Sequence, residues 1–364
     1  MKKLLMILVT FCIMLTVSYA NEVNLDGLDG YLEENGNKKI VDMKSFNGDE
    51  NLTLVLTPDE IDEMEEEGIY KLEINMQHLK FRIKIKELVD KGKIRISSEY
   101  KDDLYYVKVH SSICGYINEF DSKVEILIPY DMDEESYYIT MFGVDENEQI
   151  INFRGFMLEE TKEVLVRIKT IEFPLIPVVN KIIYKDLGEY SWAKEYIEES
   201  AAKGLLTGKE EGIYAPDENV TRAEFVTLLV KALDLELVEK TSNFIDVSKE
   251  DWFHDYIVTA ESCGLISEID SDKFNPESSI TRQDIVIMVG KALEKFYDME
   301  IEDYEYKFID AEDINQEAVS YLKKCLAMNL VSGYEDDTFS PDDYAKRAEA
   351  AVIINKLFNK INGF

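Results

Sequence analysis

Hydrophobic and polar residues alternate with a period of two along the first half of the chain. The alternating runs lie between about Asn51 and Ile176, and clusters of Asp, Glu, Asn and Gly separate them. This pattern is typical of antiparallel strands that bury one face. Eight runs show it: NLTLVLT, YKLEINM, KFRIKIKEL, GKIRISS, DLYYVKVH, KVEILIPY, YYITMFGV and EVLVRIKTIEF. Strands at this spacing predict an antiparallel β-sandwich-like domain.

Three shorter segments differ from the alternating runs. The stretch TPDEIDEMEEEG predicts a short helix that Thr57 caps, with Pro58 in its first turn. Residues 21–50 show no clear period, so we expect them to be loosely ordered. The stretch FPLIPVVNK holds two prolines three residues apart, which disfavour a helix or a central strand. It predicts a linker at 177–183.

The second half changes to a helical period and contains three copies of one unit. Each copy reads aromatic-x-Asp, a helix, a turn, a loop with aromatic-x-Pro, and a second helix. A single helical hairpin cannot bury its apolar face alone, so we expect the copies to pack on one another. The marker residues are Asp186, Trp192, Gly204, Pro216 and Arg222, then Asp246, Trp252, Gly264, Pro276 and Arg282, then Asp310, Asn329, Pro341 and Arg347.

The second helix of each copy begins with a capping signal of different strength. Thr221 and Glu224 have the spacing of a capping box, in which each side chain bonds the other residue's amide. Thr281 and Asp284 form a weaker version, and Lys346 replaces the threonine in the third copy. The three helices therefore start at equivalent positions, each with an arginine directly after the cap.

The first twenty residues predict a secretory signal peptide. Lys2 and Lys3 precede an apolar run from Leu4 to Val17, and small residues follow at the expected cleavage site. We expect an exported mature chain without a membrane span. The expected division is 1–20 signal peptide, 21–50 loosely ordered segment, 51–176 β-rich domain, 177–183 linker, and repeats at 184–239, 240–303 and 304–364.

The charge of the chain limits its partners. It carries 74 acidic and 40 basic residues, a formal net charge of −34. Such a surface repels phosphate backbones, so we expect no nucleic-acid partner. An anionic ligand would need a few local cations or bridging divalent ions. The acidic loops DMDEES and YEDDTFSPDD lack the features of a strong calcium loop, so we expect only non-specific association of divalent cations there.

The sequence offers little for catalysis. The three histidines, His78, His110 and His254, do not have metal-ligand spacing, and no nucleophile elbow or phosphate loop occurs. Acidic pairs are so frequent that most are expected to be solvated surface. We expect no enzyme, no cofactor and no metal site. The cysteines of the mature chain, Cys114, Cys263 and Cys325, are expected to be buried free thiols.

The repeated unit resembles a known family. The segment YKDLGEYSWAKEYIEESAAKGLLTGKEEGIYAPDENVTRAEFVTLLVKAL is similar to a surface-layer homology (SLH) repeat, with its aromatic-x-Asp start, WA-containing helix, GLLxG turn and TRAE box. The segments that begin FIDVSKEDWF and FIDAEDINQE resemble the second and third repeats. The resemblance implies an all-α, pseudo-threefold helical bundle with grooves between its copies. It also implies non-covalent binding to a secondary cell-wall polymer linked to peptidoglycan, commonly pyruvylated.

The resemblance also suggests roles for the marker residues. A ketal carboxylate suits a planar cation at a helix start, so the expected anion readers are Arg222, Arg282 and Arg347. Trp192 and Trp252 could stack on a sugar or fill the core. The aspartates could hold the groove, accept from sugar hydroxyls or cap a helix; they are Asp186, Asp246 and Asp310.

The three copies are not equal. The Thr-Gly of the family's turn is kept at Gly208 and, as Ser-Gly, at Gly333, but it becomes Ser267-Glu268 in the second copy. Glu317 replaces the tryptophan in the third. We expect fewer than three working grooves, the better ones using Arg222 with Gly208 or Arg347 with Gly333. On this ranking, Arg222→Ala should weaken wall binding more than Arg282→Ala.

Two functions from different classes remain open from the sequence, beside a third possibility that the repeats serve mainly protein–protein assembly. The first is a cell-surface protein that the repeats anchor to the bacterial wall through an anionic polysaccharide. The second gives the β-rich domain an enzymatic or adhesive role on extracellular carbohydrate, with the repeats as its anchor. A cleft with convergent polar groups in the β-rich domain would favour the second.

Overall fold

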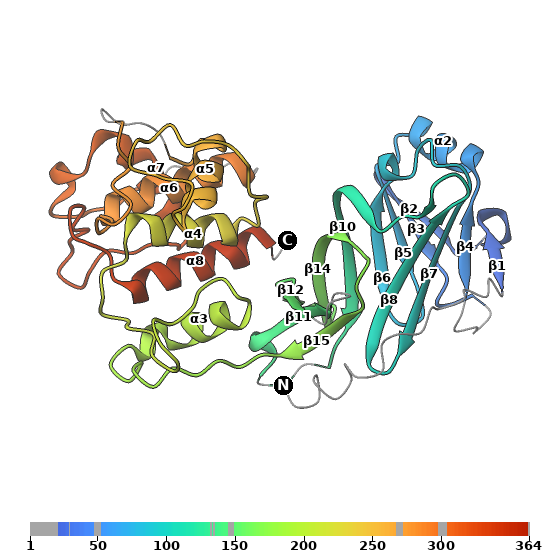
Figure 1. Ribbon diagram of the computed structural model, residues 1–364, viewed down its shortest axis with the longest axis horizontal. Coiled ribbons are helices and arrows are strands. Elements are labelled where there is room, and N and C mark those ends of the chain that lie inside the picture. The colour runs from blue at the N-terminus through green and yellow to red at the C-terminus, as the bar shows by residue number, and fades with distance from the viewer. Residues whose placement is uncertain are drawn as a thin grey trace. The chain divides into compact units, whose positions relative to one another are not determined.

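The computed structural model describes residues 21–28, 30–46, 52–131, 133, 135–144, 149–266, 272–297 and 304–362. The predicted signal peptide and the turn Ser267-Glu268 therefore lie outside the described residues. The chain divides into two compact units, Met1–Asn180 and Lys181–Phe364 (Figure 1). The first is rich in strands and the second in helices.

Two sheets make up the first unit. One has the order β1 (Glu22–Asn24), β4 (Thr53–Leu56), β7 (Ile94–Lys101), β8 (Leu104–Ser111), β15 (Leu175–Val179), β11 (Ile139–Val144) and β12 (Ile150–Asn152), with β9 (Gly115–Tyr116) beside β8. The other has the order β13 (Phe156–Leu158), β14 (Glu163–Thr170), β10 (Glu119–Pro129), β6 (Lys80–Lys84), β5 (Lys71–Asn75), β3 (Lys38–Asp42) and β2 (Leu32–Asn35). Each of the eight runs that the sequence marked contains a strand.

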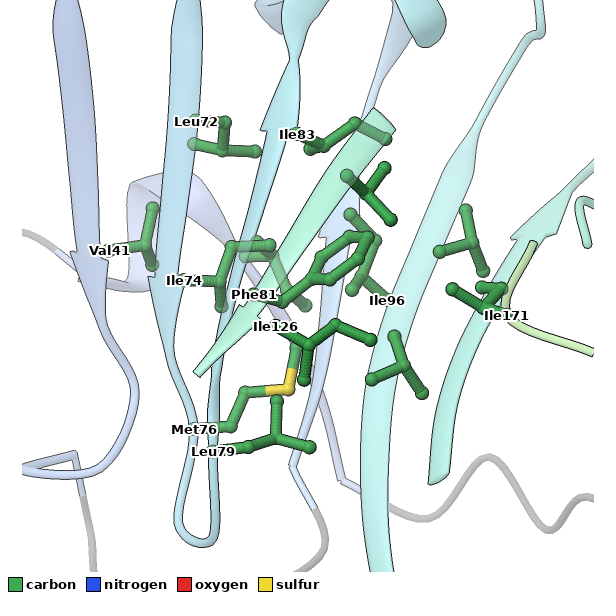
Figure 2. Close-up of a cluster of buried hydrophobic side chains, with 14 of the residues drawn as sticks. Val41, Leu72, Ile74, Met76, Leu79, Phe81, Ile83, Ile96, Ile126 and Ile171 are labelled. Carbon is green, nitrogen blue, oxygen red and sulfur yellow. The ribbon is translucent and has the colours of Figure 1, made fainter. Parts of the chain in front are cut away.

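The two sheets share one hydrophobic core. Figure 2 shows Phe81 and Ile126 of the second sheet beside Ile96 of the first, and all three side chains are almost fully buried. Burying a side chain of this size contributes about 1.5–3 kcal/mol. Helix α2 (Pro58–Glu66) covers part of the same core, and its capping box is formed as predicted, with Pro58 in the first turn. Three 3₁₀ turns complete the unit: η2 (Leu25–Leu28), η3 (Ile85–Glu87) and η4 (Ser136–Tyr138).

The segment expected to be loosely ordered instead contains β1, β2 and β3. Leu25, Leu28 and Val41 from this segment are buried in the core. These strands have only three to five residues, so their alternation is too brief to show as a period. The pairs β1–β4 and β3–β5 are parallel, so the sandwich is not wholly antiparallel.

The predicted linker begins inside the sheet. Strand β15 runs to Val179 and carries Pro177, which pairs with Met141 of β11. On its other side β15 pairs with β8 at Leu175, before the proline. Pro177 therefore lies where β15 behaves as an edge strand, a position that tolerates a missing amide donor.

Three helical hairpins form the second unit. Their first helices are α3 (Ser191–Ala202), α5 (His254–Ser262) and α7 (Gln316–Ala327), and their second helices are α4 (Arg222–Ala232), α6 (Arg282–Phe296) and α8 (Arg347–Asn362). A 3₁₀ turn, η5 (Ala311–Asp313), precedes α7. The first helices end on left-handed residues, namely Gly204, Gly264 and Asn329, as the sequence predicted for the glycine.

The helix starts follow the predicted gradient of capping. Thr221 and Glu224 form a complete box, with each side chain bonded to the other residue's amide. Thr281 accepts from the amide of Asp284, 3.2 Å away. In the third copy the amide of Lys346 donates to Glu349 at 2.8 Å, so only the glutamate half of the box remains.

The hairpins pack in a cycle. The second helix of each copy contacts the first helix of the next: α4 with α5, α6 with α7, and α8 with α3. Backbone bonds repeat the same cycle, because Arg222 N donates to Ser278 O, Arg282 N to Asp343 O, and Arg347 N to Glu218 O. Short β-bridges join the copies as well, at Asn219–Lys346, Thr221–Ser279 and Thr281–Tyr344. Among the described residues, no helix has the length and apolar character needed to cross a membrane.

Candidate functional site

The three marker aspartates hold the loop of their own copy. Asp186 accepts from the amides of Tyr214 and Ala215, the latter at 2.7 Å. Asp246 and Asp310 bond the equivalent loop amides. Ala215 has a φ of 60°, a strained value for a residue with a Cβ, which the carboxylate helps to maintain. The helix-cap interpretation of these aspartates is therefore wrong, and they fix the loop on which the arginine of the preceding copy docks.

The arginines join neighbouring copies. Arg282 donates from Nε to Phe339 O and from Nη2 to Ser332 O, both at 2.9 Å. Its Nη1 pairs with Glu349 at 3.0 Å, and its guanidinium lies 5.0 Å from the Phe339 ring centre. All three partners belong to the third copy. The guanidinium is thus a cross-link between copies as well as a local positive charge.

The other two arginines repeat these contacts around the cycle. Arg347 bonds Tyr214 O and Thr207 O of the first copy, and Arg222 bonds Phe274 O of the second. Each also pairs with the third residue of the next second helix: Arg347 with Glu224 at 3.5 Å and Arg222 with Asp284 at 2.8 Å. The glutamate of the TRAE box therefore caps its own helix and holds the preceding copy.

The pKa of Glu224 reflects this double role. Burial opposes ionisation of the carboxyl, but the bond from Lys209, the Thr221 amide and the charges of Lys209 and Arg347 outweigh it. The net result is a pKa below the ordinary value of a glutamate. The carboxylate therefore remains charged at neutral pH and keeps the contact between copies.

The turn glycines are required by close packing. A Cβ on Gly333 would lie 2.3 Å from Cε1 of Phe308, and one on Gly208 would lie 2.4 Å from the carbonyl oxygen of Ile213. Neither distance is compatible with a larger residue unless the backbone moves. Gly208 and Gly333 therefore seat the turn against the aromatic residue that starts each copy.

The structure corrects the predicted pairing of arginines and turns. Arg282, rather than Arg347, reaches the Ser332-Gly333 turn, and Arg347, rather than Arg222, reaches Thr207-Gly208. The error arose because an arginine was paired with the turn of its own copy, whereas the cycle joins it to the turn of the next. The expectation that Arg222→Ala weakens wall binding more than Arg282→Ala rested on the wrong pairing and therefore loses its basis.

A groove opens where all three copies meet. It has a volume of about 240 Å³ and is lined by Trp192 of the first copy, Arg282 of the second, and Gly333, Tyr334 and Lys356 of the third. We call it the Trp192 groove. Leu330, Val331, Val352 and Ile353 give it an apolar floor. An aromatic wall, an apolar floor and a few cations suit a sugar ring that bears a negative group.

Both tryptophans are on the surface. Trp192 is 52% exposed and Trp252 is 60% exposed, so the core-packing interpretation is wrong. Trp192 is one of the residues that line its groove. Stacking on a ligand remains a prediction for both residues.

Lys356 was missed by the sequence analysis although a signal was present. A lysine follows each marker arginine by nine residues, at Lys231, Lys291 and Lys356. Each lysine faces the first helix of the next copy: Lys231 lies over Tyr256, Lys356 lies over Tyr196, and Lys291 pairs with Glu317. Burial lowers the pKa of Lys356, because desolvation disfavours the charged ammonium.

Two more groups in the Trp192 groove form a pair. Tyr334 donates its hydroxyl to Glu349 at 2.9 Å, and Glu349 also accepts from Arg282. Burial, followed by the nearby carboxylates, raises the pKa of Tyr334 to about 12, despite the opposing charge of Arg282. Glu349 is therefore compensated by its donors and does not make the groove acidic.

The third copy has an acidic residue at the position equivalent to Trp192. Glu317 stands where the tryptophan should be, and its carboxylate pairs with Lys291 at 3.3 Å. In the cycle, Glu317 and Lys291 are the equivalents of Trp192 and Lys356. We call this position the Glu317 site. Lys291 of this site is neutralised by Glu317. In the Trp192 groove, which Lys356 lines, the position equivalent to Glu317 is Trp192, which carries no charge.

The remaining candidates are possible metal ligands and the thiols. Among the described residues, no group of His, Cys, Asp and Glu side chains has the arrangement needed to hold a metal ion. The thiols are free, but only Cys325 is fully buried; Cys263 is partly buried and Cys114 is exposed, contrary to expectation. Cys114 lies in a turn between β8 and β9, where no helical period could reveal its exposure.

The geometry defines a class of protein. Its members combine a cyclic triplet of helical hairpins with a separate β-unit. Comparison with known families identifies the triplet: the S-layer homology domain model matches residues 183–226, 243–286 and 307–351. The C-terminal half of the chain thus consists of three S-layer homology repeats, as the sequence resemblance indicated.

Curated proteins match the same half. The chain is 30% identical over 182 residues to an exoglucanase of Acetivibrio thermocellus, covering 50% of this chain and 17% of the relative. It is 26% identical over 192 residues to a surface-layer 125 kDa protein of Lysinibacillus sphaericus, covering 52% and 16%. It is 30% identical over 166 residues to a cellulosome-anchoring protein of A. thermocellus, covering 44% and 37%. The chain thus spans well under half the length of each of these relatives.

Proposed function

We propose that this protein is exported and held non-covalently at the bacterial cell surface by its three S-layer homology repeats. Relatives with these repeats include a surface-layer protein and a cellulosome-anchoring protein. The cyclic hydrogen bonds and helix contacts support one pseudo-threefold bundle, held together by the arginines. Because the repeats are common to relatives with different names, they account for attachment rather than for a particular activity.

The proposed ligand is an anionic secondary wall polysaccharide, a pyruvylated sugar in particular. The Trp192 groove carries this proposal, because residues from all three copies line it. The Trp192 indole offers a stacking face, while Lys356 and the Arg282 guanidinium supply positive charge in a chain that is otherwise strongly acidic. A carboxylate on the sugar would lie nearest Lys356, because Arg282 already has three protein partners.

Cosedimentation of the full chain with polymer-bearing sacculi tests this assignment. We expect Trp192→Ala to weaken binding at least tenfold, because removing a central aromatic contact costs more than about 1 kcal/mol. Glu317→Ala at the equivalent position of the third copy is the matched control and should change binding less than twofold. Binding that persists in Trp192→Ala, or on sacculi stripped of the polymer, would contradict the proposal.

We also propose that the β-unit has no catalytic role. His78 and His110, the histidines of this unit, pack against Tyr100 and Tyr116 on strands β7 to β9. Such ring contacts fit a structural role. An assay of the full chain on wall and plant polysaccharides that releases reducing sugar would contradict this proposal and favour the anchored enzyme.

A further inference from the structure

The outer face of the second sheet is cationic although the chain is acidic. Along β3, β5 and β6, inward residues such as Val41, Leu72 and Phe81 enter the core (Figure 2). The residues between them point outward. Six outward side chains of this sheet form what we call the lysine face: Lys38, Lys71, Lys80, Arg82, Lys84 and Arg167.

Three lysines stand directly opposite one another on adjacent strands. Lys38 of β3 is in register with Lys71 of β5, and Lys71 is in register with Lys84 of β6. Like charges at such positions destabilise a sheet. Ion pairs of Lys38 with Glu73 and of Lys71 with Glu125 offset this repulsion within the fold.

The carboxylates on this face lie beneath the cations. Glu73 pairs with Lys38 and Arg82, Glu125 with Lys71, Arg82 and Arg167, and Glu163 with Lys80. The side chains of these glutamates are only 6–16% exposed, whereas those of their cationic partners are 24–32% exposed. Solvent therefore meets ammonium and guanidinium groups, and the cations outnumber the carboxylates.

Solubility does not account for this face. A net charge of −34 already keeps the chain dispersed, and a cationic surface on it invites association with acidic surfaces. The lysine row runs across the strands, with a cation every ~4.8 Å. A row of this kind matches an extended polymer that carries repeated negative groups better than it matches a single small ion.

We propose that the lysine face binds a carboxylate-bearing wall polysaccharide, as a second contact beside the Trp192 groove. This inference rests on the proposed function, because it takes the same class of polymer as its ligand. The contact is electrostatic and shallow, so it is weak at physiological salt and strong at low salt. The β-unit then increases the affinity of the whole chain for the polymer, in addition to being held at the cell surface by the repeats.

The test uses the full chain and polygalacturonate, a polysaccharide with a carboxylate on each sugar, with neutral dextran for comparison. At low salt, K38Q/K71Q/K84Q should weaken binding to polygalacturonate about tenfold. The control K44Q/K93Q/K101Q changes the same number of exposed lysines in this unit and should stay within twofold. K38R/K71R/K84R keeps the charges and should retain binding, which separates charge from any loss of fold.

Three results would overturn the proposal. The glutamine triple variant could bind like its control, the arginine variant could lose binding, or the glutamine variant could change only self-association in sedimentation velocity. Sacculus binding by Trp192→Ala separates this inference from the proposed function. If Trp192→Ala loses sacculus binding and the glutamine triple variant does not, the groove proposal stands and the lysine-face proposal fails. If only the glutamine triple variant loses binding, the lysine-face proposal stands and the groove proposal fails.

Discussion

Single residues in this protein often perform two tasks at once. Glu224 caps its own helix and pairs with Arg347 of another copy. Asp186 fixes a loop that places Ala215 at a left-handed φ, and Arg347 docks on the carbonyl just before it. The sequence showed these residues as a repeated pattern, but spacing alone cannot tell whether a carboxylate meets a backbone amide, an arginine or a sugar.

Glu125 gives a prediction for pH. Burial opposes its ionisation, but Lys71, Arg167 and Arg82 outweigh this and lower its pKa from the ordinary 4.5. Because the folded pKa is below the unfolded one, the stabilisation is complete above about pH 4.5 and is lost as the pH falls through the folded value. We expect Glu125→Gln to cost about 2 kcal/mol at pH 7 and progressively less below pH 4.5.

Urea unfolding of both proteins from pH 3 to pH 7 measures this difference. The change in overall self-repulsion on acidification is nearly the same in wild type and variant, so it cancels. Glu119→Gln, at an exposed position of the same strand, is the control and should follow the wild type throughout. A Glu125→Gln deficit that does not depend on pH would mean that packing, not charge, is lost.

At the level of elements, the order of the helices was predictable and their partners were not. Capping boxes, left-handed helix ends and the 60-residue period are local signals, and each appears in the structure. The cycle that joins α4 to α5, α6 to α7 and α8 to α3 depends on contacts between copies. Since three copies can be joined in either direction, their sequences alone did not show that Arg282 meets the turn at Gly333.

The short strands escaped prediction for a related reason. β1 pairs with β4, β3 pairs with β5, and β2 pairs with β3 at the edge of its sheet. Their stability comes from this pairing rather than from their own pattern. The exposure of Trp192 is likewise set by which helix face the neighbouring copy covers. Local sequence patterns therefore predicted the helices and the longer strands. The short edge strands and the Trp192 groove depend on contacts that exist only in the assembled fold.

The equivalent lysines allow a matched comparison of two elements. Lys356 of α8 lines the Trp192 groove, while Lys291 of α6 is paired with Glu317. We expect Lys356→Ala to weaken sacculus binding about tenfold, because a cation close to the ligand is lost, and Lys291→Ala to change it less than twofold. Dissociation constants from cosedimentation check this, and equal losses in the two variants would mean that the Glu317 site also binds polymer.

For the whole molecule, the two proposals assign separable contributions to attachment to the two units. The contacts of the second unit close on themselves, from Arg347 back to Glu218, so we expect residues 181–364 to fold without the first unit. This fragment should bind sacculi at high salt as tightly as the full mature chain, because the Trp192 groove is intact in both. At low salt the full chain should bind at least threefold more tightly, since only it carries the lysine face.

The salt dependence of the ratio between the two dissociation constants distinguishes the contributions. Shallow contacts between exposed charges lose strength as ions screen them, whereas stacking on Trp192 depends little on salt. The ratio should therefore fall towards one as salt rises. A fragment that is folded by circular dichroism but does not bind would show that attachment needs the β-unit. A ratio of one at every salt concentration would show that the first unit carries cationic side chains on its sheet without using them to hold the wall.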